Sequence, residues 1–268
     1  MQLLLAFGLA FLGTGSGRAQ ILPPNSMGVS MGHVHLNVKD IDAQKKFWIE
    51  QFGATELKRD GLPGVKVPGM LILFLQQEPA SPSEGAVIDH FGFKVRSLQE
   101  TLKSCRAAGV LVLREFKGNE GFPNAYVMAP DDVKVELQED TSLPVRAAAQ
   151  HLHYMVKDVP SLQTWYVKMF GAQAVKRGTH DSADIPGMNL TFDLNRGDTA
   201  RPGTKGRAMD HIGFEVRNLE AFCKRLEAEG VKFDVPYRHS ANLGIGVAFL
   251  TDPVGSYIEL TEGLNKFY

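Results

Sequence analysis

The chain of 268 residues contains only two cysteines, Cys105 and Cys223. Two thiols are too few for the disulfide framework of a small secreted scaffold or for a cysteine-rich zinc site. Both fall within helical patterns, and they do not occupy equivalent places in the repeat described below. We therefore expect two separate buried thiols that behave as small apolar side chains.

The sequence also has little net charge and few of the familiar catalytic signatures. Lys and Arg number 29 against 30 Asp and Glu. This balance gives no reason to expect nucleic acid or an anionic membrane surface as a partner. No nucleophile elbow, phosphate-binding loop or zinc-ribbon spacing is present. Beyond residue 20 no apolar run is long enough for a transmembrane segment.

The N-terminal segment differs from the rest of the chain. An apolar run, LLLAFGLAFLG (3–13), is followed by the small and polar TGSGRAQ. The run is too short to span a bilayer but is typical of a secretory signal, and Gly17 and Ala19 suit its cleavage site. Because no basic residue precedes the run, an apolar tail is the alternative. Residues 1–20 are predicted to be a signal peptide, and the protein to be periplasmic or secreted.

An internal duplication organises the remainder. GHVHLNVKD (32–40) returns as QHLHYMVKD (150–158), with His33 and His151 118 residues apart. DHFGFKV (89–95) returns as DHIGFEV (210–216), and PDDVKVEL (130–137) as PVGSYIEL (253–260). A repeat of this size indicates two homologous domains. We place them at residues 31–141 and 149–265, joined by TSLPVRAAA (141–149).

Each repeat is itself divided into two modules, which open at His33, His90, His151 and His211 and are numbered 1 to 4 here. Each module begins with a half-buried strand, continues with a helix that stops at a glycine, and ends in strands punctuated by Pro and Gly. Ser97 and Glu100 form a capping-box pattern at the start of the second helix. The prediction is an α+β fold of four βαβββ modules, with helices on one face of each sheet.

Period-two alternation predicts that a set of polar side chains shares the sheet face away from the helices. Two imidazoles and one carboxylate recur in both repeats, and such a triad binds a divalent metal while leaving positions open. The alternative is the solvated side of half-exposed sheets. The residues on this face are His33, His35, His90 and Glu136 in the first repeat and His151, His153, His211 and Glu259 in the second.

These modules and motifs resemble the vicinal oxygen chelate superfamily, which includes glyoxalase I, bleomycin resistance proteins and extradiol dioxygenases. The resemblance covers nearly everything after residue 30. It implies that two modules curl into a cup around a divalent metal such as Fe, Mn, Zn, Ni or Co. It also implies that the first residue of each opening strand and a Glu on the last strand are the ligands. In this sequence those are His33, His90 and Glu136, then His151, His211 and Glu259.

The sequence departs from two branches of this superfamily. Glyoxalase I has a further carboxylate ligand on the last strand of its first module, where Phe74 or Phe192 falls in our alignment. Extradiol dioxygenases carry a His before the second metal ligand and a Tyr before the Glu. Here residues 195–210 contain no His, and Phe249 lies near the expected Tyr. His239 matches another cavity histidine of those enzymes.

Roles for the remaining histidines follow from their positions. His35 and His153 lie two residues from a proposed ligand on the same face, so they are predicted to orient ligands or to exchange protons. The competing interpretation is a solvated or structurally bonded histidine. His239 is a third catalytic candidate, whereas His180 is interpreted as a structural loop residue.

Two functional hypotheses remain. The first is an exported metalloenzyme, of the isomerase, lyase or dioxygenase type, whose metal chelates vicinal oxygens of a small substrate. The second is a metal-free protein that sequesters a small molecule between modules. Both predict a small-molecule ligand and a monomer or homodimer, and the retained triads favour the first.

Overall fold

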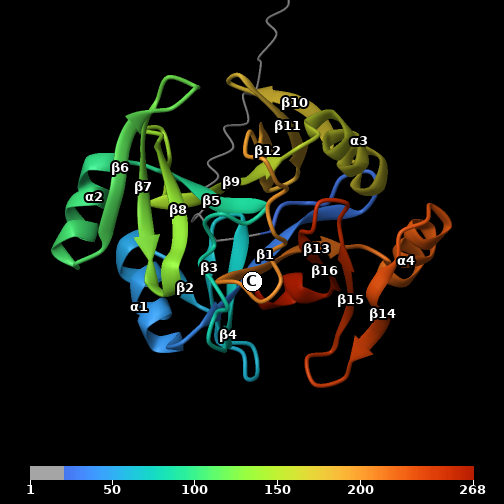
Figure 1. The fold of residues 1–268 in the computed structure, drawn as a ribbon. Coiled ribbons are helices and arrows are strands. Elements are labelled where there is room, and N and C mark those ends of the chain that lie inside the picture. Colours follow the sequence, from blue (N-terminus) through green and yellow to red (C-terminus); the bar gives the residue numbers. More distant parts are fainter. Residues whose placement is uncertain (1–20) are drawn as a thin grey trace, which may run out of the picture.

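The computed structural model describes residues 21–268, so the predicted signal peptide lies outside the described residues (Figure 1). Four βαβββ modules follow one another along the chain, which confirms the predicted α+β fold. Module 1 consists of β1 (Val29–Val38), α1 (Ile41–Phe52), β2 (Thr55–Glu56), β3 (Gly64–Val67) and β4 (Met70–Gln76). Module 2 consists of β5 (Ile88–Val95), α2 (Leu98–Ala107), β6 (Leu111–Lys117), β7 (Pro123–Ala129), η1 (Pro130–Asp132) and β8 (Val133–Glu139).

The second repeat has the same order. Module 3 consists of β9 (Ala147–Val156), α3 (Val159–Phe170), β10 (Gln173–Arg177), β11 (His180–Ile185) and β12 (Met188–Leu194). Module 4 consists of β13 (Met209–Val216), α4 (Leu219–Ala228), β14 (Phe233–Ser240), β15 (Ile245–Thr251), β16 (Tyr257–Glu262) and the short helix η2 (Leu264–Phe267). Within residues 21–268, none of the helices has both the length and the apolar character needed to cross a membrane.

Local sequence explains where the helices begin and end. The Lys-Asp pair that closes each opening strand supplies the N-cap, because Asp40 accepts from the amides of residues 42 and 43 and Asp158 from that of Ser161. α1 and α3 both end at a glycine with left-handed backbone, Gly53 at φ 70° and Gly171 at φ 65°. The capping interaction predicted at Ser97 is present as a bond from the Glu100 amide.

The modules pair differently from the expected order. β1 pairs antiparallel with β13, and β5 pairs antiparallel with β9, so one eight-stranded sheet combines modules 1 and 4 and the other combines modules 2 and 3. The expectation that each repeat, 31–141 or 149–265, closes its own cup is therefore wrong. Homologous modules offer equivalent edges, so repeat similarity cannot decide which edges join. The linker between β8 and β9 is short, and the two strands flank β5 on opposite sides in one sheet.

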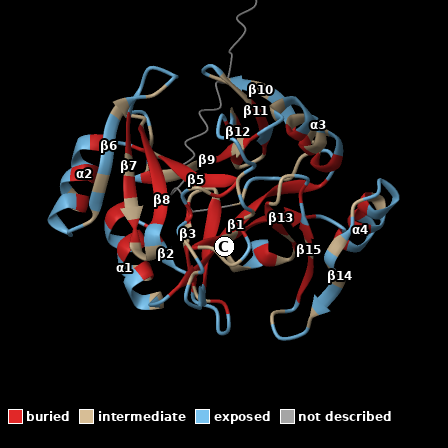
Figure 2. Cartoon of the chain, in the orientation of Figure 1, coloured by how far each residue is buried: buried red, intermediate tan, exposed pale blue. Residues whose placement is uncertain are grey.

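One contiguous core unites the two sheets. α1 follows β1 of the first sheet along the chain, but its Trp48 packs on the second sheet. The ring centroids of Trp48 and of Phe91 and Phe93 on β5 are 5.7 Å apart in both pairs. Phe170 of α3 likewise packs on Phe214 of β13 at 5.1 Å. Figure 2 shows the buried residues gathered in the strands and on the inner faces of the helices. Cys105 and Cys223 are both buried and unpaired, as expected from the sequence.

Candidate metal centres

The cross-module pairing gathers the polar residues into two clusters. Centre 1 consists of His33, His35, His211 and Glu259, and centre 2 consists of His90, Glu136, His151 and His153. In each cluster one ligand atom per residue lies within 4.8 Å of the others. The predicted sets, His33 with His90 and Glu136 and His151 with His211 and Glu259, are wrong in their grouping. The second histidine and the glutamate stay together, but the first histidine comes from the other repeat.

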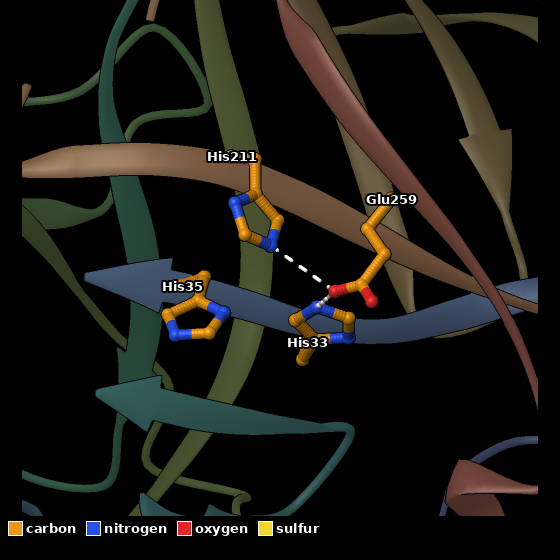
Figure 3. Close-up of side chains that lie close together, drawn as sticks. All are labelled: His33, His35, His211 and Glu259. Atoms are coloured by element: carbon orange, nitrogen blue, oxygen red, sulfur yellow. Dashed lines mark hydrogen bonds and ion pairs between the residues drawn. The ribbon is translucent and has the colours of Figure 1, made fainter. Parts of the chain in front are cut away.

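Centre 1 converges on one carboxylate oxygen (Figure 3). Oε2 of Glu259 lies 2.9 Å from Nε2 of His33 and 3.1 Å from Nε2 of His211. His35 faces the same cluster, with its ring centroid 4.6 Å from that of His211. Both ring nitrogens of His35 and Nδ1 of His33 are shielded from solvent without a hydrogen-bond partner. A bound cation would supply the partner that a buried nitrogen lone pair needs.

Centre 2 repeats this geometry. Oε2 of Glu136 lies 2.8 Å from Nε2 of His90 and 3.4 Å from Nε2 of His151. The other oxygen, Oε1, accepts a hydrogen bond of 2.6 Å from Asn124 on β7. His151 is fully buried, and His90 and Glu136 are exposed by only 3% and 5%. These residues are therefore not a solvated sheet face.

An aspartate orients one histidine in each centre. Nδ1 of His90 lies 2.9 Å from Asp89, and Nδ1 of His211 lies 2.6 Å from Asp210. Each aspartate is the extra residue of a β-bulge, where the pairing of β5 with β9 and of β1 with β13 shifts by one position. The carboxylate accepts a hydrogen bond from the Nδ1–H group, so Nε2 is the ring atom directed to the centre. Carboxylate–histidine pairs of this kind support metal ligands.

Glycines provide the space for the remaining histidines. Gly213 lies opposite His33, and Gly92 opposite His151, across the module junctions. A Cβ atom at Gly213 would lie 2.0 Å from Cε1 of His33, and one at Gly92 would lie 2.1 Å from Cε1 of His151. The glycine of each H-x-G-F motif is therefore required because an imidazole from the neighbouring module rests on it.

Charge coupling within the centres is strong. Burial would lower the pKa of His211, but its hydrogen bonds to Asp210 and Glu259 outweigh that effect and raise the pKa to about 9. Burial opposes ionisation of Glu259, yet bonds from His211 and His33 hold the pKa of its carboxyl well below the ordinary range. Burial, with His211 and His33 nearby, lowers the pKa of His35 to about 3. The Glu259 carboxylate is thus anionic and His35 is neutral, while His211 would give up its proton on binding a metal. Two or more imidazoles with one carboxylate form a donor set that fits a divalent metal.

Glu136 and His153 of centre 2 line a pocket of about 280 Å³, which we call the centre-2 pocket. Nε2 of His153 lies 3.1 Å from Asp193 of β12, and the other Asp193 oxygen lies 2.5 Å from Nδ1 of His180. His180, interpreted from the sequence as structural, thus lines the pocket beside His153. Arg114 and Lys117 also line it, and within residues 21–268 neither forms an ion pair.

The structure corrects one alignment and places one further candidate elsewhere. Phe74 and Phe192 lie in the apolar core, on the faces opposite the centres, so neither replaces a metal-binding carboxylate. The carboxylate that β12 directs toward centre 2 is Asp193, one residue later. His239, a predicted catalytic residue, is exposed on edge strand β14 opposite Gly246 and belongs to neither centre.

Several functional candidates escaped the sequence prediction. Asp89 and Asp210 precede the histidines in both copies of the D-H-x-G-F motif, and this recurrence was the available signal. Strict alternation places an aspartate on the face opposite its neighbour, so only the bulge explains the contact. Asn124 and Asp193 had no such signal, because neither residue recurs in the other repeat. Val247 occupies the position equivalent to Asn124, and Leu75 the position equivalent to Asp193.

Comparison with known proteins agrees with this fold. The family model of the Glyoxalase/Bleomycin resistance protein/Dioxygenase superfamily matches residues 30–137 and 148–260. The chain belongs to this superfamily, as its motifs indicated. It is 21% identical to a lactoylglutathione lyase of Schizosaccharomyces pombe, with 87% of this chain and 96% of that protein covered.

Solved structures show the same architecture. Glyoxalase I from Zea mays superimposes with a TM-score of 0.73 at 17% identity, covering 89% of this chain and 93% of that one. A Bacillus subtilis protein named as a possible dioxygenase gives a TM-score of 0.67 at 13% identity, covering 91% and 86%. At these identities the structures establish the fold, and the reaction has to be argued from the site.

Proposed function

We propose that this protein is a metal-dependent enzyme of the glyoxalase type, with its reaction at centre 2. The observation that carries the proposal is a buried His90, His151 and Glu136 set whose glutamate, with the adjacent His153, lines a polar pocket. Three protein ligands with an open side are the arrangement of a catalytic rather than a structural metal site. A divalent metal bound there would polarise an oxygen of the substrate and stabilise the negative charge that develops on it.

The chain's own residues have distinct tasks in this proposal. Asp89 holds the ring of His90, and Asn124 fixes the orientation of the Glu136 carboxylate. Asp193 accepts a hydrogen bond from Nε2 of His153, so Nδ1 of His153 is the unprotonated atom and has no partner. That nitrogen is the candidate to receive and return a proton when hydrogen moves between neighbouring substrate carbons.

The pocket favours a small anionic substrate. The carboxylates that line it are already engaged, Glu120 with Arg177, Asp193 with two histidines and Glu136 within centre 2. Arg114 and Lys117 therefore remain as cations available to a ligand. The volume lies just below the usual range for ligand pockets, about 300–1,000 Å³, which also favours a small ligand. Lactoylglutathione, which the fission yeast relative is named for, is accordingly the first compound to test.

The decisive experiment compares Glu136→Gln with Glu259→Gln in protein purified without chelators or metal-affinity resin. Metal content and formation of lactoylglutathione from methylglyoxal and glutathione are measured for both variants. Loss of activity and of one metal equivalent in Glu136→Gln, with activity retained in Glu259→Gln, is the expected result. Activity that depends on Glu259 and not on Glu136 would contradict the assignment of centre 2.

A dioxygenase is the second candidate, because two histidines and one glutamate also form the ligand set of non-haem Fe(II) enzymes. Iron in the purified protein, with oxygen uptake on addition of a catechol, would select it. If the protein contains no metal and takes up none of Fe, Mn, Zn, Ni or Co, the enzyme proposal fails. Sequestration of a small molecule in the same pocket then becomes the better interpretation.

We also propose that the protein is exported and that residues 1–20 are removed. The support is the apolar run followed by a small-residue cleavage site. N-terminal sequencing of the mature protein from its native host should begin near Gln20 or Ile21. A chain that retains Met1 would contradict this proposal.

A further inference from the structure

The two centres are alike in their histidines but differ in their walls. In centre 2, β12 carries Asn189, Thr191 and Asp193 beside β9 on the face of the histidines. At the corresponding positions in centre 1, β4 carries Leu71, Leu73 and Leu75, with Leu71 paired to His33 and Leu73 to His35. Parallel neighbours in register point to the same side of a sheet, so leucines line the cup of centre 1.

The leucines belong to an apolar cluster separate from the main core. Leu71 and Leu73 meet Val247 and Ile245 of β15 in this cluster, and all four are exposed by no more than 4%. Val247 occupies the repeat position of Asn124, and Phe249 that of Tyr126. Two polar groups beside centre 2 are thus replaced by apolar ones beside centre 1.

The C-terminal segment completes this cluster. Leu264 of η2 is 1% exposed within it, and Phe267 and Tyr268 pack against it. The segment is anchored at its start, because Glu215 accepts hydrogen bonds from the amides of Gly263 and Leu264. Figure 1 shows the C-terminus lying over the middle of the first sheet, between β3 and β16.

The arginines in the two cups have different partners. In the centre-2 pocket Arg177 pairs with Glu120 at 3.0 Å. Its counterpart Arg59 lies over the ring of Phe267, with Cζ 5.0 Å from the centroid, and Leu243 replaces Glu120 in the sequence repeat. Arg177 thus borders the polar pocket beside centre 2, whereas the equivalent Arg59 makes a cation–π contact with the C-terminal segment beside centre 1.

The third imidazole also differs. Nε2 of His153 is engaged by Asp193, which directs that ring toward the pocket. His35 has no such partner, and both of its ring nitrogens are shielded from solvent without a hydrogen bond. One of them lies within 4.8 Å of the ligand atoms of His33, His211 and Glu259. Four protein ligands with no position left for a substrate are the arrangement of a structural metal site.

We infer that centre 1 is a structural metal site with His35 as its fourth ligand, and that residues Leu264–Tyr268 cover its leucine-lined side. The metal there joins module 1 to module 4, because His33 and His35 lie on β1 while His211 and Glu259 lie on β13 and β16. The two ends of the described chain are thereby tied together. This role is distinct from the reaction proposed for centre 2, which needs an open ligand position.

The test is metal release from the full-length protein loaded with Zn²⁺ or Co²⁺, followed with a colorimetric chelator. Two equivalents are expected to leave in two phases, with the slower at least about tenfold slower, a difference of the size that supporting residues produce in metal affinity. Glu259→Gln and His35→Asn should abolish the slow phase and lower the melting temperature by about 5 °C or more. Glu136→Gln should abolish only the fast phase.

The C-terminal segment provides a second, independent variant. A chain that ends at Gly263 should keep both equivalents but release them at similar rates. If this chain does not fold, the double variant Phe267→Ala with Tyr268→Ala serves the same purpose. Equal release rates in the unaltered protein would overturn the inference, as would a slow phase that persists in Glu259→Gln.

The outcomes also separate this inference from the proposed function. A single equivalent that is lost in Glu136→Gln would overturn the structural role of centre 1 and leave centre 2 standing. A single equivalent that is lost in Glu259→Gln would support centre 1 and contradict the proposed enzyme. Absence of any bound metal would contradict both.

Discussion

Gly92 and Gly213 connect the packing of the modules to the chemistry of the centres. An imidazole from the neighbouring module packs directly against each glycine. A methyl group added at either position would overlap that ring. The clash involves a ring that is fully buried, so the ring has to move or the strands have to separate.

Substitution of these glycines is predicted to remove one metal each. Gly213→Ala should displace His33, and Gly92→Ala should displace His151, with a loss of about 1–3 kcal/mol in the free energy of unfolding from overpacking. Urea unfolding and metal stoichiometry of each variant check this result. Gly197→Ala is the control, because its methyl would meet only a side-chain oxygen at 3.2 Å.

The raised pKa of His211 predicts a pH dependence for the metal-free protein. A histidine whose folded pKa lies above its unfolded value of 6.5 stabilises the fold fully below pH 6.5, and this contribution is lost as pH rises through about 9. The free energy of unfolding should therefore fall by on the order of 1–3 kcal/mol between pH 6.5 and 9.5.

Chemical denaturation of the metal-free protein at several pH values measures this slope. His211→Gln should remove the contribution of centre 1 to the slope of unfolding free energy against pH. The contribution of His90, whose pKa is also raised, should remain. Metal binding should show the opposite trend and strengthen with pH, because ligation displaces the proton from His211. A metal-free wild type with a flat profile over this window would contradict the coupling between His211, Asp210 and Glu259.

Helix caps differ between otherwise equivalent elements. Asp158 accepts from the Ser161 amide at 3.0 Å and caps α3, whereas Asn218 before α4 makes no side-chain cap and has a left-handed backbone with φ 56°. In α4 the amides of Asn218 and Leu219 donate instead to Glu262 of β16.

Asp158→Ala is predicted to lower the free energy of unfolding by about 0.5–2 kcal/mol through loss of the cap. Asn218→Gly should change it by only a few tenths of a kcal/mol, because glycine accepts the left-handed backbone and the Glu262 bonds are retained. Thermal unfolding of the two variants compares them directly. A larger loss in Asn218→Gly than in Asp158→Ala would show that the side chain of Asn218 matters in a way the contacts do not indicate.

At the scale of the whole molecule, the pairing of β1 with β13 and of β5 with β9 makes the two repeats interdependent. Each sheet and each centre takes residues from both repeats. The connection at residues 140–146 crosses no sheet and includes exposed positions such as Ser142 and Pro144.

Cleavage of this connection is predicted to leave the two halves associated. A protease site inserted between Ser142 and Pro144 should yield fragments that elute together in size-exclusion chromatography and retain bound metal. They should separate only in denaturant, because both sheets and the shared core join them. Fragments that separate freely in native buffer would mean that each repeat closes its own cup after all.

Local features were readable from the sequence in this protein because short-range physics decides them. The Asp40 and Asp158 caps, the glycine stops and the period-two strands each depend on neighbours within a few residues. The duplication then placed every histidine and glutamate of the two centres on the polar face. Side-chain period alone assigns a residue to a face of a strand, although it cannot say which strand lies beside it.

Only the tertiary structure decided which residues meet. Four homologous modules present equivalent edges, and sequence similarity is the same whether module 1 joins module 2 or module 4. The choice depends on chain connections and on long-range packing such as Trp48 of α1 against β5. For the same reason the leucines of β4 and the C-terminal Leu264 were recognisable as apolar residues but not as members of one cluster beside centre 1. The sequence by itself therefore determined the modules and the candidate ligands, and the fold determined how those residues are shared between two centres.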